Sequence, residues 1–377
     1  MHPLATMNAP TSPPVKDTPP CYSINSPPFS NSTTSAYLSM VFCSLGLISN
    51  LIAFVVLLMS FRRTHSRSRS FFLIFLGGLV VTDFMGLLVT GSIVLSFHFT
   101  SFNWRKLDPK CHLCNFMGMS MVFYGLCPLL LGAAMAVERF IGINRPFARS
   151  TSMPKNRTIS MVLMVWFIAG CIALLPLTGI GSYHIQIPGS WCFLNISSEG
   201  NDLVFSLLFS LVGLTSIIVS FLLNTVSVVT LIKVCCGQVN NQRRRDHEVE
   251  MMIQLILIMV IASVCWCPLL VFIAQIVLSG NDLQVGSLLL WIRFATWNQI
   301  LDPWVYILFR RAVLQRIYPR FDWSRGSIIS KYPSFSNTMR RFTRSSLGST
   351  LGSNETGEAG KSNLTPPSTL MPPPPSP

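Results

Sequence analysis

An arginine lies inside the last long apolar stretch of the chain, residues 286–309, seven residues from its outer end. A charged side chain within a lipid-spanning segment is costly, and such residues are usually retained for a function. Asp302, the nearest acid in this stretch, is nine residues from Arg293, about 13 Å along a helix axis, which is too far for a direct ion pair. We therefore expect Arg293 to bind an anion from outside the chain. The alternative is that its side chain extends to the outer lipid headgroups, about 10 Å away.

The surroundings of Arg293 indicate which anion this is. The outer halves of the long apolar stretches contain no aspartate or glutamate, and methionine, phenylalanine and leucine are abundant. A site with one guanidinium contact and apolar walls suits a fatty-acid-like carboxylate. The sequence therefore predicts a membrane receptor for an acidic ligand, with no metal and no cofactor.

Two further groups of ionisable residues lie within or beside apolar stretches. Asp83 is alone in the middle of the second stretch, where it could bind an ion, share a proton or hydrogen-bond to Asn50 or Asp302. Such a carboxylate belongs either to a static polar contact or to a network that switches between states. Glu138 and Arg139 end the third stretch, either as an ion pair that reaches the headgroups or as a switchable contact for a cytoplasmic partner.

Two proline-containing segments predict flexible kinks. Cys265–Pro268, with the sequence Cys-Trp-Cys-Pro, lies in the sixth stretch, and Asp302–Tyr306, with Asp-Pro-Trp-Val-Tyr, lies near the inner end of the seventh. Proline removes a helix hydrogen bond and bends the helix. Because both kinks adjoin polar or aromatic side chains, we expect a bundle that rearranges, with Asp302, Pro303 and Tyr306 taking part.

Seven apolar stretches must position these residues. The chain of 377 residues is 50% hydrophobic and 11% charged, whereas soluble proteins carry about a quarter charged residues. Each stretch can cross about 30 Å of hydrocarbon, and only helices satisfy their own backbone there. The predicted fold is therefore an all-α bundle of seven transmembrane helices. The stretches are 36–60, 71–97, 112–137, 158–181, 203–234, 251–279 and 286–309.

The distribution of basic residues predicts the orientation of the bundle. The net charge of +14 comes mostly from arginines and lysines that follow the first, third, fifth and seventh stretches. Positive residues gather on the cytoplasmic side, so we expect an extracellular N-terminus and a cytoplasmic C-terminus in the plasma membrane. Nucleic-acid binding is the weaker explanation of this charge.

The two ends of the chain have the composition of disordered segments. Residues 1–35 are rich in Pro, Ser, Thr and Asn and lack the apolar core of a signal peptide, so the first stretch is expected to insert as an uncleaved anchor. We assign 36–320 to the transmembrane domain and 321–377 to a disordered cytoplasmic tail. The sequons at Asn31 and Asn195 fall outside and are predicted to carry glycans.

Four of the 11 cysteines lie on the predicted outer side, namely Cys21, Cys111, Cys114 and Cys192. An even number in an oxidising compartment predicts two disulfides, with three possible connectivities. Cys111 and Cys114 share a helix face and are unsuited to bond to each other. We expect the pairs Cys114–Cys192 and Cys21–Cys111. A zinc site is disfavoured because no second pair of ligands follows.

Other classes of membrane protein fit less well. Asp83 and Asp302 resemble the acids of an intramembrane aspartyl protease, but its Gly-x-Gly-Asp motif is absent. A retinal photoreceptor needs a lysine in the seventh stretch, which has none. A secondary transporter has paired broken helices from internal repeats, which we do not find. The chain is therefore not expected to be an enzyme.

Together these residues resemble the rhodopsin-like G-protein-coupled receptors over 36–320. The matching positions are Asn50, Asp83, Glu138, Arg139, Trp166, Cys265–Pro268, Pro303 and Tyr306, with Cys114 and Cys192 at the usual disulfide. The resemblance implies a short amphipathic helix after the seventh span. It also implies that a heterotrimeric G protein docks when Arg139 is released. Phe140 replaces the tyrosine of the wider family.

Within that family the chain is similar to the prostanoid receptors. The shared features are Gly189–Phe193, Arg293, Asp302 where most relatives have asparagine, and a fifth span without proline. The resemblance implies that Arg293 holds the carboxylate of a lipid-derived ligand. The other residues that it implies for the ligand site are Trp191 and Ser190 as a cap, with Phe193, Thr90, Met121 and Trp266.

Three stretches are most similar to a single prostanoid receptor subtype, namely 129–136, 248–252 and 295–311. That likeness implies signalling through Gq, with phospholipase C and calcium, and also through G12/13. The alternative is another subtype, for a prostaglandin or prostacyclin.

Overall fold

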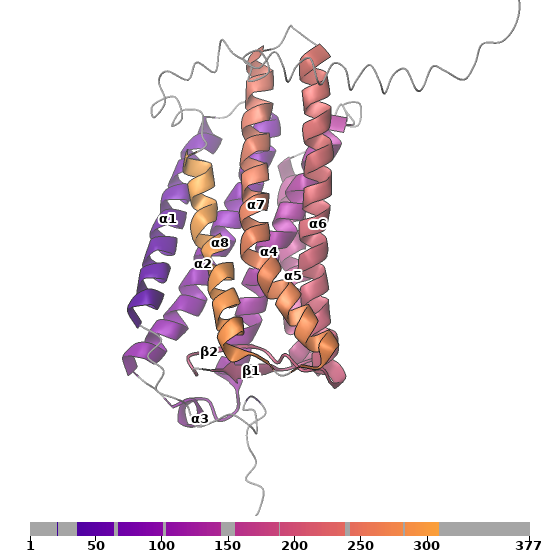
Figure 1. The fold of residues 1–377 in the computed structure, drawn as a ribbon. Coiled ribbons are helices and arrows are strands. Elements are labelled where there is room, and N and C mark those ends of the chain that lie inside the picture. The colour runs from indigo at the N-terminus through magenta and orange to yellow at the C-terminus, as the bar shows by residue number, and fades with distance from the viewer. Residues whose placement is uncertain are drawn as a thin grey trace, which may run out of the picture. The chain divides into compact units, whose positions relative to one another are not determined.

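Seven long helices lie side by side in the computed structural model of the chain, with a small β-hairpin across one end (Figure 1). The structure describes Cys21 and residues 36–63, 67–100, 103–144, 155–187, 189–237, 242–281 and 283–308. The expected terminal segments, apart from Cys21, and the amphipathic helix after the seventh span lie outside these residues. The long helices are α1 (Ala36–Arg62), α2 (Arg67–Thr100), α4 (His112–Asn144), α5 (Lys155–Leu174), α6 (Gly200–Gly237), α7 (Gln242–Ser279) and α8 (Val285–Leu308).

The long helices confirm the predicted all-α class, because each apolar stretch corresponds to one of them. Among the described helices, α1, α2, α4, α5, α6 and α7 are long and apolar enough to cross a membrane. The sequence of α8 is less apolar because it contains Arg293, Asn298, Gln299 and Asp302. Its packing against α1 and α7 gives these polar residues a protein environment in place of lipid.

Two helix ends differ from the sequence-based expectation. The fourth helix ends at Leu174 and continues as a 3₁₀ helix, Leu175–Thr178, because Pro176 has no N–H to continue the α-helical pattern. The α6 helix begins at Gly200, before its apolar stretch, so its first turn includes Asp202. The apolar stretch 203–234 itself contains no acid in its outer half, and Asp202 lies one residue before it.

The β-hairpin was not predicted from the sequence. Its strands β1 (Tyr183–Gln186) and β2 (Trp191–Leu194) are antiparallel, with Gln186 opposite Trp191 at the turn. Gly189 in the turn has a φ of 96°, which is a backbone conformation that favours glycine. The Tyr183 hydroxyl donates to the carbonyl of Ala173 at 2.7 Å, which attaches the hairpin to α5.

Both expected disulfides are present at the hairpin end of the bundle. Cys114 at the start of α4 is bonded to Cys192 of β2, and Cys21 is bonded to Cys111. The backbone of Cys21 also accepts a hydrogen bond from the N–H of Ile185 at 3.1 Å. The two bridges therefore connect the hairpin, α4 and the N-terminal segment.

A short helix, α3 (Trp104–Leu107), adds a further support for the hairpin. Its tryptophan is buried, and the indole N–H donates to the carbonyl of Gly189 at 2.6 Å. Asp108 follows this helix, and its carboxylate accepts from the N–H groups of His112 and Cys114 at 2.7 and 2.9 Å. The carboxylate thereby satisfies donors at the start of α4, which have no partner within the helix.

Candidate functional site

A cavity that is partly open to the outside lies beneath the hairpin, between α1, α2, α4 and α8. Arg293 lines this cavity together with Ser190 and Trp191 of the hairpin. The remaining walls are mostly apolar, with Phe42 from α1 among them. The structure thus places the arginine and the outer loop at one site, as the sequence-based hypothesis required.

A second cavity adjoins the first. Thr90, Met121, Ile292 and Thr296 line both cavities, so they form the boundary where the two spaces meet. The residues that line only the second cavity include aromatic, apolar and amide side chains from α4, β2, α7 and α8. They are Tyr124, Gly125, Phe193, Trp266, Leu269, Ala295 and Gln299. All the residues that the sequence predicted for a ligand site therefore line one or both of these cavities.

Arg293 gives this site its charge. Its side chain is half-buried, and it makes no hydrogen bond or ion pair within the part of the chain that the structure describes. The described residues that line the two cavities include no aspartate or glutamate. A guanidinium with unused donors in an apolar cavity attracts an anion, and a carboxylate fits its forked geometry.

Two more hydrogen-bonding groups line the cavity of Arg293. The His98 Nε2 atom and the Trp191 Nε1 atom are both buried and have no hydrogen-bond partner among the described residues. Buried polar atoms without partners are rare and call for an explanation, such as an absent ligand. The sequence analysis missed His98. Its spacing of eight residues from Thr90, with Val94 midway, is the signal that could have placed it on the same helix face.

Trp266 of α7 also lines the second cavity, and it lies two residues before Pro268 in the same helix. Gly125 of α4 faces this indole, and a Cβ atom there would lie 2.8 Å from the tryptophan ring. Only a glycine lets the ring stay where it is. The structure adds a further proline, Pro128 within α4, that the kink prediction did not include.

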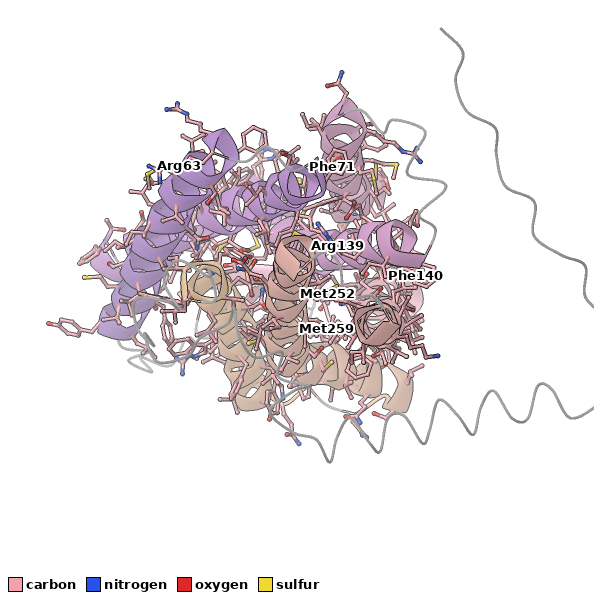
Figure 2. All side chains as sticks on the ribbon, turned by 90° about the horizontal axis from the view of Figure 1, so that it is seen from above. Arg63, Phe71, Arg139, Phe140, Met252 and Met259 are labelled. Atoms are coloured by element: carbon pink, nitrogen blue, oxygen red, sulfur yellow. A yellow bond between two sulfur atoms is a disulfide. The ribbon has the colours of Figure 1, made fainter. Side chains whose placement is uncertain are left out.

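At the opposite end of the bundle, Arg139 forms the ion pair that was predicted. Its Nε atom lies 3.2 Å from Oε2 of Glu138, and its guanidinium lies over the ring of Phe72, 5.0 Å from the ring centre. Figure 2 views the bundle from this end and shows Arg139 among the helices, whereas Arg63 lies at the periphery. The Arg139 side chain is buried, so the groups of the expected switch are closed off in this conformation.

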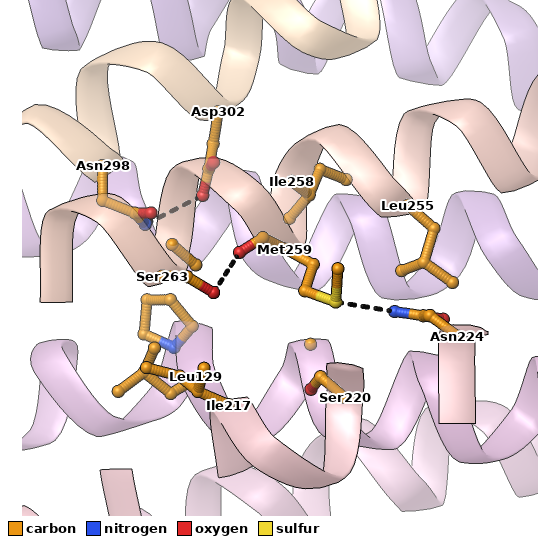
Figure 3. A pocket seen from close by; sticks show the side chains of 13 residues that line it. Leu129, Ile217, Ser220, Asn224, Leu255, Ile258, Met259, Ser263, Asn298 and Asp302 are labelled. Carbon is orange, nitrogen blue, oxygen red and sulfur yellow. Dashed lines mark hydrogen bonds between the residues drawn. The ribbon is translucent and has the colours of Figure 1, made fainter. Parts of the chain in front are cut away.

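The polar residues between the two ends are connected differently from the prediction. The Asn50 amide donates to the carbonyls of Gly46 and Gln299 at 3.0 and 2.9 Å, and not to Asp83. Asp302 accepts from the Asn298 amide at 2.9 Å (Figure 3). The two predicted partners of Asp83 are therefore not hydrogen-bonded to it, although Asp83 and Asp302 interact electrostatically.

A small pocket adjoins Asn298 and Asp302 and is shown in Figure 3. Asn224 of α6 lines its other side, where the amide donates to the sulfur of Met259 at 3.5 Å. Among the described residues there is no cluster of three or more histidine, cysteine, aspartate or glutamate side chains that could hold a metal ion.

Comparison with known proteins agrees with this architecture. The family described as "7 transmembrane receptor (rhodopsin family)" matches residues 49–306. Squid rhodopsin has the same fold, with a TM-score of 0.59 and 19% identity over 76% of this chain and 85% of that chain.

Similarity to prostanoid receptors is much closer in sequence. The thromboxane A2 receptor of Bos taurus is 56% identical over 79% of this chain and 90% of its own length. The human thromboxane A2 receptor is 55% identical over 76% of this chain and 87% of its own length. The mouse prostaglandin F2-alpha receptor is 41% identical over 75% of this chain and 79% of its own length. The subtype indicated by the three sequence stretches is thus the thromboxane A2 receptor. The chain belongs to the rhodopsin family of seven-transmembrane receptors, which are not enzymes, and within that family to the prostanoid receptors.

Proposed function

We propose that this receptor binds a prostanoid acid in the two adjoining cavities, and that the ligand is thromboxane A2. The observation that carries the proposal is Arg293, a half-buried cation without a partner among the described residues, in a cavity whose described walls hold no acid. The similarity to thromboxane A2 receptors supports the choice of ligand.

The geometry of the cavities suggests how the ligand lies. Its carboxylate binds Arg293, and the nearby N–H of Trp191 and the His98 ring offer further hydrogen bonds. The apolar chain passes between Thr90 and Met121 into the second cavity, towards Trp266. This arrangement combines one strong ionic contact with a long apolar path, which suits a fatty-acid derivative.

We propose that signalling starts when the apolar chain of the ligand occupies the second cavity. Trp266 lines the second cavity and lies two residues before Pro268 in α7. A ligand in this cavity would therefore contact the helix that is expected to move. Opening of the cytoplasmic end would separate Arg139 from Glu138 and Phe72 and allow a G protein of the Gq or G12/13 class to bind. Calcium release through phospholipase C is the expected result.

The orientation of the chain is proposed to be N-terminus outside, in the plasma membrane. Both disulfides lie at the hairpin end, and disulfides form in oxidising compartments, which supports an extracellular position for this end. Glycosylation at Asn31 and Asn195 stays a prediction; a glycan on the Asn195 Nδ2 atom would leave that nitrogen one N–H, which can still donate to Asp202. Asn31 lies outside the described residues, and Asn195 follows β2 at the same end of the bundle.

A panel of ligands tests the proposed function. Membranes from cells that express the full chain are incubated with a radiolabelled stable thromboxane mimetic and with unlabelled prostaglandin F2α, prostaglandin E2 or a prostacyclin mimetic. Saturable binding that the thromboxane mimetic displaces best supports the proposal. Stronger displacement by a prostaglandin or the prostacyclin mimetic would assign the other subtype, and no saturable binding of any acid would reject the ligand class.

A further inference from the structure

We infer that Asp202, which lines neither cavity, is a positioning residue that holds the hairpin closed over the ligand site and thereby sets how fast the ligand enters and leaves. The inference rests on the proposed function, because it takes the hairpin to cover a bound ligand. The observations that carry it are the hydrogen bonds made by the Asp202 carboxylate at the base of the hairpin.

The carboxylate of Asp202 joins the two ends of the hairpin. Its Oδ1 accepts from the Ser182 hydroxyl at 2.9 Å, and its Oδ2 accepts from the Asn195 amide at 2.7 Å. Ser182 immediately precedes β1 and Asn195 immediately follows β2, and the Asn195 N–H donates to the Ser182 carbonyl at 2.9 Å. Both oxygens of one charged group therefore clamp the residues that begin and end the hairpin.

The clamp is anchored on a long helix. Asp202 lies in the first turn of α6, where the helix dipole favours a negative charge. The Ser206 hydroxyl, one turn further along α6, donates to the Asn195 carbonyl at 3.2 Å. The same helix therefore holds Asn195 through its side chain and through its backbone, and the base of the hairpin is fixed to α6.

The other end of the hairpin covers the ligand cavity. Ser190 and Trp191 line the cavity of Arg293, and Trp191 is four residues from Asn195, about 13 Å along an extended strand. For a ligand to leave past these residues, the hairpin has to shift. Charged hydrogen bonds at its base oppose that shift, although they touch neither ligand nor cavity.

The hairpin keeps several other attachments when the clamp is lost. The Cys114–Cys192 disulfide, the Tyr183 bond to Ala173 and the Trp104 bond to Gly189 are all independent of Asp202. A variant without the carboxylate is therefore expected to fold, and its hairpin is expected to open more often. This predicts an effect on rates, because loop opening commonly limits the release of a bound molecule.

The test compares Asp202→Ala with Asp202→Asn and with Glu199→Gln in the full-length receptor. Asparagine keeps one carbonyl oxygen that can accept from Ser182, so it should restore part of the clamp. Glu199 is exposed and lies just before α6, so Glu199→Gln removes a nearby negative charge without touching the hairpin base. Association and dissociation of a radiolabelled thromboxane mimetic are measured, together with amide hydrogen exchange over residues 182–195 without ligand.

We expect Asp202→Ala to release the probe on the order of tenfold faster, because hydrogen bonds to charged groups are among the stronger ones. Its association rate should rise too, so the Kd changes by less than the dissociation rate, and exchange over 182–195 should be faster. Asp202→Asn should be intermediate and Glu199→Gln should match the wild type.

Two results would overturn the inference. One is wild-type rates and wild-type exchange in Asp202→Ala. The other is a loss of binding sites in which the remaining sites keep wild-type rates, which is what a purely structural role predicts. Failure of the wild-type receptor to bind the probe would instead reject the proposed function, and the ligand-free exchange measurement would still decide whether Asp202 restrains the hairpin.

Discussion

Replacing Arg293 with leucine removes the permanent positive charge from the proposed carboxylate site while it keeps an apolar side chain there. The change should leave folding and surface expression intact, because Arg293 makes no hydrogen bond or ion pair with the described residues. It should weaken the binding of acidic prostanoids, because their carboxylate would then enter an apolar cavity without a partner.

The size of the effect follows from the burial of Arg293. Loss of one partner of a fully buried ion pair costs about 3–5 kcal/mol. Since Arg293 is half-buried, the lower end applies, and about 3 kcal/mol corresponds to roughly two decades in Kd. Arg293→Lys should also lose affinity, because an ammonium group cannot form the paired contacts of a guanidinium with a carboxylate.

The assay uses an acidic prostanoid and its methyl ester as competitors on cells matched for surface expression. The wild-type receptor should prefer the acid over the ester by a factor close to the loss caused by Arg293→Leu. The leucine variant should bind both with similar, low affinity, because the two changes remove the same interaction. If a well-expressed Arg293→Leu receptor keeps its affinity for the acid, the ion pair does not form. The arginine would then be a residue that reaches the headgroups.

The remaining predictions concern other parts of the receptor. Arg139→Ala should keep agonist binding but lose nucleotide exchange and calcium release. If the variant kept full calcium release, Arg139 would instead be a residue that reaches the lipid headgroups. Cys21→Ser and Cys111→Ser should impair binding equally, because each variant removes the same Cys21–Cys111 disulfide. Peptide mapping under non-reducing conditions that finds Cys21 free would refute this disulfide. Burial lowers the pKa of His184, partly offset by Asp202, so the open hairpin takes up a proton more readily. Acidification from pH 7.5 to 5.5 should therefore speed ligand release, and His184→Gln should remove this acceleration.

The helices and the unusual position of Arg293 could be predicted because each depends on a local property. Runs of apolar residues fix the number of helices, since lipid leaves the backbone no other way to pair. An arginine without an acid in reach needs no tertiary information to be recognised as unusual. Excluding a Cys111–Cys114 bond left two connectivities for the disulfides, and the resemblance to rhodopsin-like receptors favoured Cys114–Cys192. The stated reason was wrong, because Cys111 precedes α4 and has a φ of 60°.

The hairpin and its contacts could not be predicted because each depends on distant parts of the chain. The two strands have four residues each, which is too short for an alternation of polar and apolar residues to stand out. Asn50 has acceptors from two helices within reach, and only packing decides that Gln299 is chosen over Asp83. Asp202 was passed over for a similar reason, because its partners Ser182 and Asn195 are brought together by strand pairing.

The composition of α8 links the two ends of the proposed mechanism. This helix carries Arg293 at the proposed ligand site and Asp302 and Tyr306 near its other end, and Arg293 and Tyr306 are 13 residues apart, about 20 Å along its axis. A helix with so many polar residues is stable in a membrane only where the bundle supplies partners for them. An anion bound to Arg293 would change the relative free energies of the arrangements of α8 at that end, and Pro303 would allow the other end of the helix to reorient. Coupling between the sites requires an element with two arrangements that both ends can bias. Among the described helices, α8 meets this requirement together with α7, because its contacts include the cavity of Arg293, the Asn298–Asp302 hydrogen bond and the buried Tyr306.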